Sequence, residues 1–339
     1  MADRRVAPVM WNTIPMTAHS TDTILTEVRD GTGTITLNRP KALNSLDHTM
    51  IRAIDAAVRQ WAEDDRVERV VVRSSSKHFC SGGDVKMARA EILAGNAELV
   101  DEFFAHEYAM NLFIAQYPKP FTALAGGVIM GGGMGISAIG GPLVVADNAF
   151  ASMPEMNIGY ITDVGMSWKL QHLPGRGSVN LGKFLGLTGY RMTPDDMLAL
   201  GLASKKIAAG EELSLADAPL EPQPSPLARW FDDIEATFAG SWADIDRRLD
   251  AQPGEFAELV RDLTKQASPS SLVATAELFE ANANQDLAGA LDNERRLGEL
   301  MRREPDFAEG VRAVLVDKDQ APEFAPQPDP DKYRAVLNF

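Results

Sequence analysis

The sequence predicts an α/β (α+β) fold, in which a largely parallel sheet with helices precedes a set of C-terminal helices. Two observations carry this prediction. Up to residue 208, short β-type runs alternate with helix-periodic stretches, a pattern typical of layered domains with much of the sheet parallel. Further along the chain, one helix-periodic stretch follows another.

The elements of the first part follow in order. Residues 23–40 alternate around Asp30-Gly31, which predicts a β-hairpin, and Pro40 ends its second strand. Residues 48–65 place apolar side chains on one helical stripe and predict an amphipathic helix. Three buried strands and two further helices are then expected, the strands over 67–75, 119–131 and 142–153 and the helices over 97–116 and 132–139.

Composition divides the chain into four parts. We expect a flexible tail over residues 1–21 and the α/β core over 22–208. Residues 209–228 are acidic and proline-rich, which predicts a linker, and residues 229–339 form a helical region. In that region Ser268 and Pro269 have the order of an N-cap residue and a first helical proline. Helical periodicity recurs over 227–239, 241–251, 254–266, 268–282 and 286–303.

The overall composition limits the class of function. The 339 residues are 45% hydrophobic and 24% charged, as in an ordinary globular protein, and the net charge of −15 argues against nucleic acid or an anionic membrane as partner. The single cysteine, Cys80, excludes an intramolecular disulfide and suits a reducing compartment, the cytoplasm or the mitochondrial matrix. We expect neither a secretory signal nor a membrane-spanning helix, because the first twenty residues and the rest of the chain lack a long apolar run.

Two glycine-rich segments have the composition of loops that approach a ligand closely. In residues 77–89 a strand ends at Gly82-Gly83, and in residues 125–138 a strand runs through glycines into a helix. Two backbone N–H groups that converge from such turns form an oxyanion hole. Tight packing of strand against helix is the alternative interpretation of either segment alone. Neither segment has the spacing of a nucleotide-binding loop. The five histidines have no metal-binding spacing, and we expect no metal.

Taken together, these segments resemble the crotonase (enoyl-CoA hydratase/isomerase) superfamily. The matching stretches are "LNRPKALNSL", "FCSGGDVK", "GGVIMGGGMGIS", "ADNAFASMPEMNIG" and "DVG". The resemblance is sharpest to the branch of 3-hydroxyisobutyryl-CoA hydrolases. It lies in "HEYAMN", in "SPSSL" and in "FAEGVRAVLVDKDQAP".

The resemblance implies a spiral of ββα turns that binds an acyl-CoA thioester. The thioester oxygen would lie between the N–H groups of Gly83 and Gly132. Glu155 and Asp163 match catalytic carboxylates of the family, and Glu107 matches a residue that the hydrolases use at the substrate. The C-terminal helices would cover the active site, and the protein would be a homo-oligomer.

Coenzyme A would arrive as part of the substrate, and no separate cofactor is expected. By resemblance, backbone atoms of Ala42 and Leu43 would contact the adenine. Lys41 and Lys86 have the charge to meet CoA phosphates, although an ordinary surface cation is the simpler interpretation of either lysine alone.

The arrangement of acids favours thioester hydrolysis. A hydratase of this fold resembles a two-glutamate enzyme, and Gly135 stands where the first glutamate would be. We therefore expect hydrolysis of a short branched 3-hydroxyacyl-CoA, such as 3-hydroxyisobutyryl-CoA in valine breakdown. Glu155 would act as nucleophile or as general base, and Asp163 would hold the 3-hydroxyl group or assist proton transfer.

Two alternatives stay open. One is an isomerase or hydratase of the same fold that uses Asp163, and the other is a non-catalytic acyl-CoA-binding protein. The segment after "DVG" departs from the hydrolase pattern, so Met166 and Trp168 could reshape the acyl pocket and change the acyl group.

Overall fold

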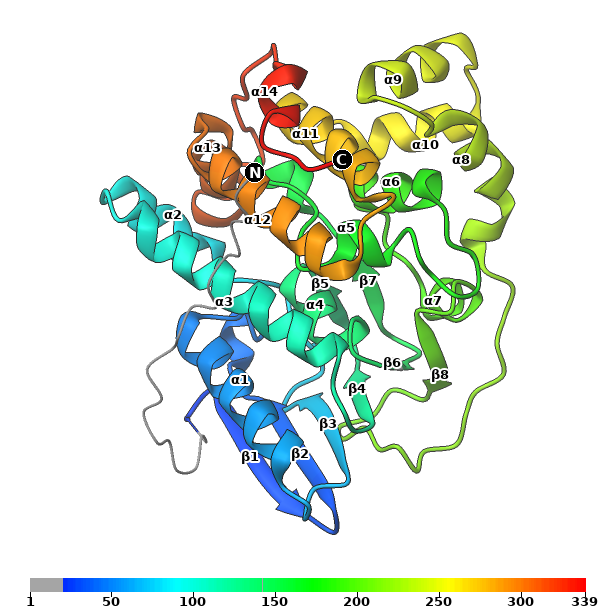
Figure 1. Ribbon diagram of the computed structural model, residues 1–339. Helices are drawn as coiled ribbons and strands as arrows, with labels where there is room; N and C mark the ends of the chain where they lie inside the picture. Colours follow the sequence, from blue (N-terminus) through cyan, green and yellow to red (C-terminus); the bar gives the residue numbers. More distant parts are fainter. Residues whose placement is uncertain (1–20, 142) are drawn as a thin grey trace, which may run out of the picture.

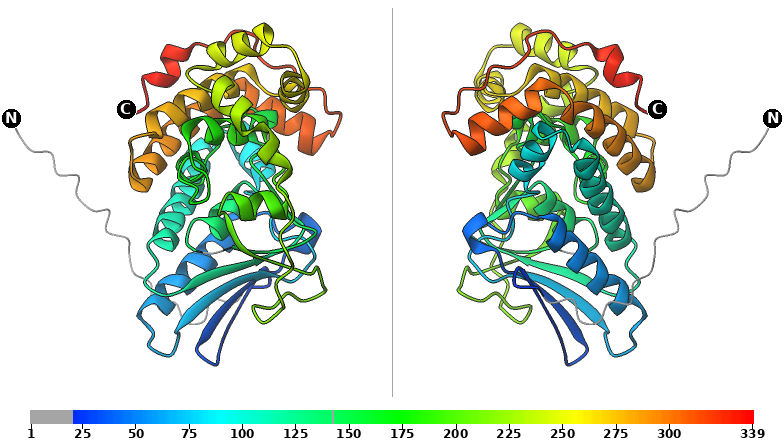
Figure 2. Two further views of the ribbon diagram at one scale, coloured as in Figure 1. Left: turned by 90° about the vertical axis from the view of Figure 1, so that its right-hand side faces the viewer. Right: turned by 90° about the vertical axis from the view of Figure 1, so that its left-hand side faces the viewer.

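The computed structural model describes residues 21–141 and 143–339. Its sheet lies at one end of the molecule and the C-terminal helices lie at the other, with α3 and α6 between them (Figures 1 and 2). Apart from residue 21, the predicted tail over 1–21 lies outside the described residues, as does the stretch in which we expect no secretory signal.

The described strands and helices are short and alternate as far as β8. The strands are β1 (Ile24–Arg29), β2 (Thr32–Leu37), β3 (Arg69–Ser74), β4 (Phe121–Ala125), β5 (Val128–Met130), β6 (Leu143–Ala146), β7 (Phe150–Ser152) and β8 (Ala203–Ile207). The helices up to β8 are η1 (Pro40–Ala42), α1 (His48–Glu63), α2 (Val85–Leu93), α3 (Ala97–Ala115), α4 (Gly132–Ala138), η2 (Glu155–Ile158), α5 (Met166–Lys169), α6 (Val179–Thr188) and α7 (Pro194–Ala199). The later helices are η3 (Pro226–Trp230), α8 (Phe231–Thr237), α9 (Trp242–Ala251), α10 (Glu255–Thr264), α11 (Pro269–Asn282), α12 (Leu287–Arg302), α13 (Pro305–Val311), η4 (Arg312–Val316) and α14 (Pro330–Arg334).

The main sheet confirms the predicted fold class. Within the described chain its strand order is β1-β2-β3-β4-β6-β8, and all neighbours are parallel except β1 and β2. The predicted hairpin is present, with Asp30 at φ 49° and Gly31 at φ 74°. Two consecutive positive φ values are those of a type I′ turn, whose twist matches that of the strands.

Two of the predicted long strands are wrong in extent. The stretch 119–131 divides into β4 and β5, and the described part of 142–153 divides into β6 and β7. β5 and β7 pair in parallel in a small separate sheet. The chain turns at Gly127 (φ 58°), where a Cβ atom would overlap the His78 ring and lie 2.6 Å from the Lys77 carbonyl oxygen. A loop packed this closely ends β4 and directs β5 toward the 79–83 segment, where Ile129 forms a bridge with Cys80.

The predicted helices of the core are present. The helix expected over 48–65 is α1, and its N-cap Asp47 accepts a hydrogen bond from Met50 N. The helices expected over 97–116 and 132–139 are α3 and α4. β8, α6 and α7 were not predicted, and β8 extends the sheet beyond β6.

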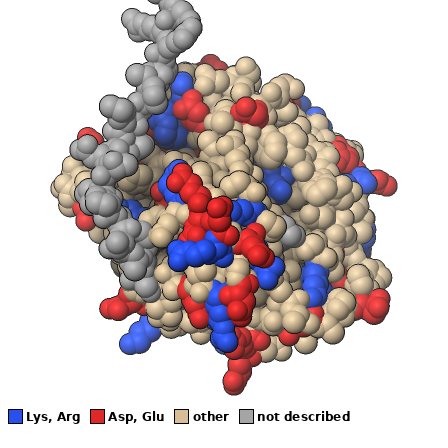
Figure 3. Space-filling view, turned by 60° about the horizontal axis from the view of Figure 1, so that its bottom comes forward, with Lys and Arg blue, Asp and Glu red and all other residues tan. Residues whose placement is uncertain are grey.

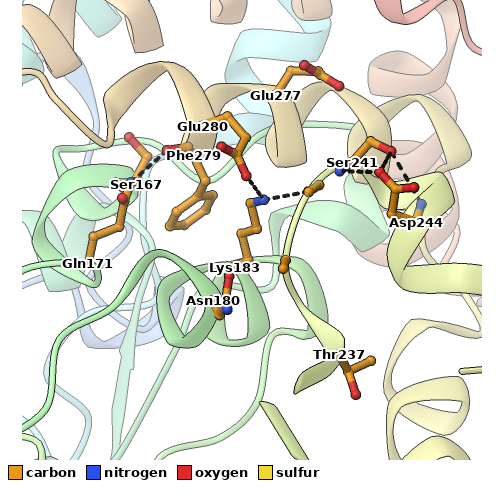
Figure 4. A network of polar contacts seen from close by, with 12 residues as sticks. Ser167, Gln171, Asn180, Lys183, Thr237, Ser241, Asp244, Glu277, Phe279 and Glu280 are labelled. Carbon is orange, nitrogen blue, oxygen red and sulfur yellow. Dashed lines mark hydrogen bonds and ion pairs between the residues drawn. The ribbon is translucent and has the colours of Figure 1, made fainter. Parts of the chain in front are cut away.

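The C-terminal helices pack on the core through α11, which contacts both α6 and α12. Ser268 is the N-cap of α11, with Pro269 at the first position, as predicted. Lys183 of α6 is fully buried and joins the two regions (Figure 4): its ammonium is paired with Glu280 of α11 and donates to the Gly240 carbonyl oxygen at 2.5 Å. Because a buried ammonium needs partners, this contact ties α6 to two C-terminal segments.

Between β8 and η3 the chain runs over the surface and, in the described residues, contains no helix or named strand. Leu220 N donates to the Lys206 carbonyl oxygen at 2.8 Å, and Arg73 pairs with Glu212 at 2.5 Å. On the face seen in Figure 3, acidic and basic side chains are intermixed. None of the described helices is long and apolar enough to span a bilayer.

Candidate active site

The structure brings the two predicted oxyanion glycines together. Gly83 follows Gly82 (φ 104°), and Gly132 begins α4 after Gly131 (φ 48°). A Cβ atom built on Gly132 would lie 3.4 Å from Gly83 N, so the two turns meet. The first turn is held by the backbone hydrogen bond from Leu46 N to the Gly82 carbonyl oxygen, at 2.8 Å.

Two glutamates lie against these turns. Glu107 of α3 is 1% exposed, and a Cβ atom on Gly132 would overlap its Oε1 atom. Glu155 begins η2 and is 7% exposed. A Cβ atom on Gly131 would lie 2.9 Å from its Oε1 atom. Among the described residues, neither Glu107 Oε1 nor Glu155 Oε2 has a hydrogen-bond partner. Buried oxygens without partners are costly unless a ligand or water meets them.

Burial also changes the acidity of both glutamates. It raises the pKa of Glu107 to about 8, and the charge of Asp163 adds to the effect. The pKa of Glu155 lies well above its usual range for the same two reasons. A carboxylate in such a place is a stronger base than one in water, which suits proton abstraction or attack on a carbonyl carbon.

Asp163, in contrast, is hydrogen-bonded within the protein. It is 4% exposed, and its Oδ2 atom accepts a hydrogen bond of 2.6 Å from the Tyr108 hydroxyl group. Burial raises the pKa of Asp163 to about 7, while the Tyr108 hydrogen bond and the charge of Arg302 act in the opposite direction. The charge of Asp163 affects both glutamates, so the three acids form one electrostatically coupled group.

The turn after Asp163 has an uncommon backbone conformation. Val164 has φ 55°, which a β-branched residue rarely adopts, and Gly165 has φ 83°. Glu294 of α12 accepts from Gly165 N at 2.7 Å and from the Ser167 hydroxyl at 2.5 Å. Asn111 Nδ2 donates to the Val164 carbonyl oxygen at 3.4 Å. These contacts fix the backbone that carries Asp163.

Four of these supporting residues escaped the sequence analysis: Tyr108, Asn111, Glu294 and Arg302. Tyr108 and Asn111 lie in "HEYAMN", one and four residues after Glu107. Residues four apart share a side of a helix, so this spacing is a signal that could have found Asn111, whereas the residue next to Glu107 points to a different side. Glu294 and Arg302 belong to a distant helix, and no local pattern marks them.

Gly135 is closed to any larger side chain. A Cβ atom there would lie 2.7 Å from Asn111 Nδ2 and 2.9 Å from Val164 Cβ. Asn111 and Val164 therefore occupy the space that a glutamate side chain would need at this position.

The residues predicted to contact CoA lie on the turn beside Gly83. Lys41 and Ala42 belong to η1, and Leu43 (φ 50°) follows it, 42% exposed. Ser81 N donates to the Leu43 carbonyl oxygen at 3.0 Å, which places this turn next to the glycine turn. The side chains of Lys41 and Lys86 are exposed, Lys86 on α2.

The turn that carries Leu43 is fixed by Asn44, which the sequence analysis also missed. Asn44 is fully buried, and its amide donates to the Phe79 carbonyl oxygen at 2.9 Å. Asn44 Oδ1 accepts from Arg39 N at 2.7 Å.

A cavity of about 400 Å³ adjoins the site on the side of α10. Its wall includes Met130 and Pro154, which directly precede Gly131 and Glu155, and Leu263 of α10 faces them. Arg191 and Lys265 also line the cavity.

The residues after "DVG" are accounted for by packing. Met166 is fully buried in the core. The Trp168 indole donates to the Gln285 carbonyl oxygen at 2.9 Å and stacks on His172, so it faces the α11–α12 connection. Cys80 is buried, and burial raises the pKa of its thiol to about 12, which makes it unreactive.

In the described parts of the chain, no three His, Cys, Asp or Glu side chains are grouped so that they could hold a metal ion.

Curated proteins of similar sequence share one name. The 3-hydroxyisobutyryl-CoA hydrolase of Danio rerio is 35% identical, over 92% of this chain and 87% of its own. The enzyme of the same name from Homo sapiens is 34% identical, over 89% of this chain and 84% of its own. Both are named mitochondrial proteins.

Two solved structures have the same fold over nearly all of the chain. An enoyl-CoA hydratase from Rhodobacter sphaeroides superposes with a TM-score of 0.84 at 34% identity, covering 93% of this chain and 97% of its own. A carnitinyl-CoA dehydratase from Mycobacterium thermoresistibile has a TM-score of 0.83 at 32% identity, covering 94% of this chain and 97% of its own. The sequence pattern described as enoyl-CoA hydratase/isomerase matches residues 32–331. The chain therefore belongs to the enoyl-CoA hydratase/isomerase family, as the sequence predicted.

Proposed function

We propose that this protein hydrolyses the thioester of a short branched 3-hydroxyacyl-CoA, with 3-hydroxyisobutyryl-CoA as its substrate and 3-hydroxyisobutyrate and CoA as products. The observation that carries the proposal is the set of acids around the paired glycine turns. Glu155 lies against Gly131, whereas the position of a second hydratase glutamate is closed at Gly135. The names of the relatives from Danio rerio and Homo sapiens support the same reaction, a step of valine breakdown.

The N–H groups of Gly83 and Gly132 would polarise the thioester carbonyl. Negative charge develops on that oxygen when the carbon is attacked, and two backbone donors stabilise it without reorganisation. Glycine is needed at position 132 because a Cβ atom there would overlap Glu107 Oε1.

Glu155 would cleave the C–S bond by one of two routes. As general base, it removes a proton from a water molecule that adds to the carbonyl carbon, and collapse of the adduct expels the CoA thiolate, which takes up that proton. As nucleophile, its carboxylate adds to the carbon and expels the thiolate, and water then hydrolyses the mixed anhydride. Burial raises the pKa of Glu155, so its ionised carboxylate is a stronger base and nucleophile than a carboxylate in water.

Asp163 and Glu107 would orient the acyl end. Glu107 Oε1 is buried without a partner next to Gly132, as expected of an atom that meets a substrate group. Asp163 would hold the 3-hydroxyl group or assist proton transfer. Backbone atoms of Ala42 and Leu43 would contact the adenine, with Lys41 and Lys86 near the phosphates.

The division of the chain supports a covered site. We propose a core over 22–208, a linker over 209–228 and a helical region over 229–339 that covers the active site from the same chain. Glu294 and Arg302 of that region contact the segment around Asp163. The mitochondrial names of the relatives favour the matrix over the cytoplasm as compartment. The same proposal includes a homo-oligomer that needs no cofactor, with CoA arriving as part of the substrate.

The test offers three thioesters to the purified protein. With 3-hydroxyisobutyryl-CoA we expect release of free thiol. Isobutyryl-CoA, which lacks only the hydroxyl group, should react much more slowly, because buried polar groups would stay unpaired. Crotonyl-CoA should remain unhydrated.

Each other outcome points to an alternative. Hydration or isomerisation of an enoyl-CoA with the C–S bond intact would support the hydratase or isomerase, the name that the Rhodobacter sphaeroides structure carries. Saturable binding of all three thioesters without turnover would support a binding protein.

A further inference from the structure

A buried chain of hydrogen bonds leads from Asp163 to the C-terminal helices. The Tyr108 hydroxyl donates to Asp163 Oδ2 at 2.6 Å and lies 3.3 Å from the Tyr160 hydroxyl. Arg302 of α12 donates from Nη1 to the Tyr160 oxygen at 2.5 Å and from Nη2 to Asp101 at 2.7 Å. The chain of hydrogen bonds joins an active-site carboxylate to α12 of the C-terminal region.

The direction of each hydrogen bond follows from the number of protons. Tyr108 has one hydroxyl proton, which goes to Asp163, so Tyr160 must donate to the Tyr108 oxygen. Arginine has no acceptor, so Arg302 donates to Tyr160. Every donor therefore points toward Asp163. Aligned hydrogen bonds strengthen one another, and such a chain stabilises the ionised form of its final acceptor.

The chain is shielded from water. Tyr160 and Arg302 are each 1% exposed, and Tyr108 is 4% exposed. The Arg302 guanidinium also lies over the Phe104 ring, 4.2 Å from its centroid. The Arg302 guanidinium pairs with Asp101 at 2.7 Å, and its positive charge also acts to lower the pKa of Asp163.

Burial opposes the ionisation of Asp163, and Arg302 is the cation among the groups that surround it. Acidic groups face it from α3, from η2 and from α12. The titratable groups around Asp163 are Glu107, Tyr108, Glu155, Tyr160, Glu294 and Arg302. The pKa values of the three glutamates are raised, to about 8 for Glu107 and Glu294, so these acids are largely protonated where Asp163 titrates. Without Tyr108 and Arg302, the low-dielectric surrounding would favour the neutral form of Asp163.

We propose that Tyr108 and Arg302 are positioning residues that act through Asp163, holding its carboxylate in one orientation and in the ionised form. The helical C-terminal region would thereby set the charge of the active site and not only cover it. The proposal rests on the hydrolase function proposed above for its kinetic test, but not for its spectroscopic one.

The first test is Tyr108→Phe, which removes one oxygen atom and keeps the ring. Its matched control is Tyr117→Phe, two residues beyond the end of the same helix, whose hydroxyl donates to the Val58 carbonyl oxygen. Loss of a hydrogen bond to a charged group should raise the pKa of Asp163 by roughly one unit. In the pH profile of kcat/KM for thiol release, the limb governed by Asp163 should move to higher pH in Tyr108→Phe only.

A second pair of variants tests the arginine. Arg302→Met should move the same limb in the same direction, whereas Arg303→Met should not, although Arg303 also pairs with Asp101. If Arg302→Met does not fold, Tyr160→Phe interrupts the chain with Arg302 in place. In an Asp163→Asn background, Tyr108→Phe should shift nothing further, since the group through which it acts is gone.

Infrared spectroscopy gives a readout that needs no activity. The carbonyl stretching band of a protonated carboxyl group that disappears in Asp163→Asn reports the titration of Asp163. Its midpoint should be higher in Tyr108→Phe than in the parent protein and in Tyr117→Phe. An equal midpoint in all three, or a lower kcat with an unmoved limb, would overturn the proposal and leave Tyr108 a structural residue. Absence of thiol release from the parent with a shifted infrared midpoint would overturn the hydrolase function alone.

Discussion

The two sides of the active site differ in how their carboxylates are bonded. On the side of the glycine turns, Glu107 Oε1 and Glu155 Oε2 are buried and find no partner in the described chain. On the other side, Asp163 accepts from Tyr108, and the turn after it is held by Glu294. Both sides are equally hidden from solvent, so burial does not explain the difference.

The difference indicates a division of labour. A buried acid without a hydrogen-bond partner is available to a substrate, although it lowers the free energy of unfolding of the protein. An acid that is already bonded has its position and charge set before the substrate arrives, which is how preorganised sites avoid rearrangement during the reaction. We therefore expect substitutions on the glutamate side to change chemistry and those around Asp163 to change geometry and pH dependence.

The largest effect is expected for Glu155→Gln. The amide can neither accept a proton nor attack the thioester carbon, so thiol release should fall by at least about a hundredfold. Glu98→Gln is the control, because Glu98 is an exposed glutamate near the start of α3. Comparable rates of thiol release in the two variants would show that Glu155 takes no part in the reaction.

Gly132→Ala should have the next largest effect. The new methyl group would overlap Glu107 Oε1, so either the Glu107 carboxylate or the Gly132 turn must move. Loss of one oxyanion donor lowers kcat by roughly a hundredfold to a thousandfold. Gly254→Ala is the matched control, since Gly254 has extended backbone (φ 165°) and nothing within 4 Å of the new methyl group. A normal kcat in Gly132→Ala would place the oxyanion site elsewhere.

Glu294→Gln tests the aspartate side. Glu294 receives hydrogen bonds from Gly165 N and the Ser167 hydroxyl, and an amide NH₂ group would face one of these donors. We expect the free energy of unfolding to fall by about 1–2 kcal/mol, measured by urea denaturation. Glu299→Gln, on the same helix but partly exposed, should change it little. An unchanged free energy of unfolding in Glu294→Gln would show that the turn does not depend on this carboxylate.

The last comparison concerns how stability depends on pH. In the folded protein Glu107 keeps its proton up to a pKa of about 8, whereas the ordinary value is 4.5. Between these values the native state binds more protons than the unfolded chain, so its free energy of unfolding falls as the pH rises. Glu107→Gln removes this contribution. The variant should gain stability relative to the parent by up to about 1.4 kcal/mol per pH unit across that window. A difference that is constant with pH would mean that Glu107 titrates normally.

Much of this arrangement was predictable because its signals are local. The Asp30-Gly31 turn, the stripe of α1 and the Ser268 N-cap depend on residues close together in the chain, and the structure has all three. The family motifs likewise predicted which glycines and acids would meet. The strand over 119–131 was predicted too long, because the turn at Gly127 depends on contact with Lys77 and His78 from another segment.

The partners of Asp163 could not be predicted in this way. Arg302 reaches Tyr160 across 142 residues of sequence, and Glu294 reaches Gly165 across 129. Their pairing depends on how α12 packs against α3 and α5, and hydrophobic periodicity predicts a helix without predicting its neighbour.

The most direct test of thioester hydrolysis is a mass balance over a single turnover of 3-hydroxyisobutyryl-CoA, with the protein in excess and ¹⁸O-labelled water as solvent. We predict one free thiol and one molecule of 3-hydroxyisobutyrate per thioester consumed, with one labelled oxygen entering the acid or, by the nucleophilic route, Glu155. A CoA ester that is recovered dehydrated or isomerised, with no free thiol, would contradict the account.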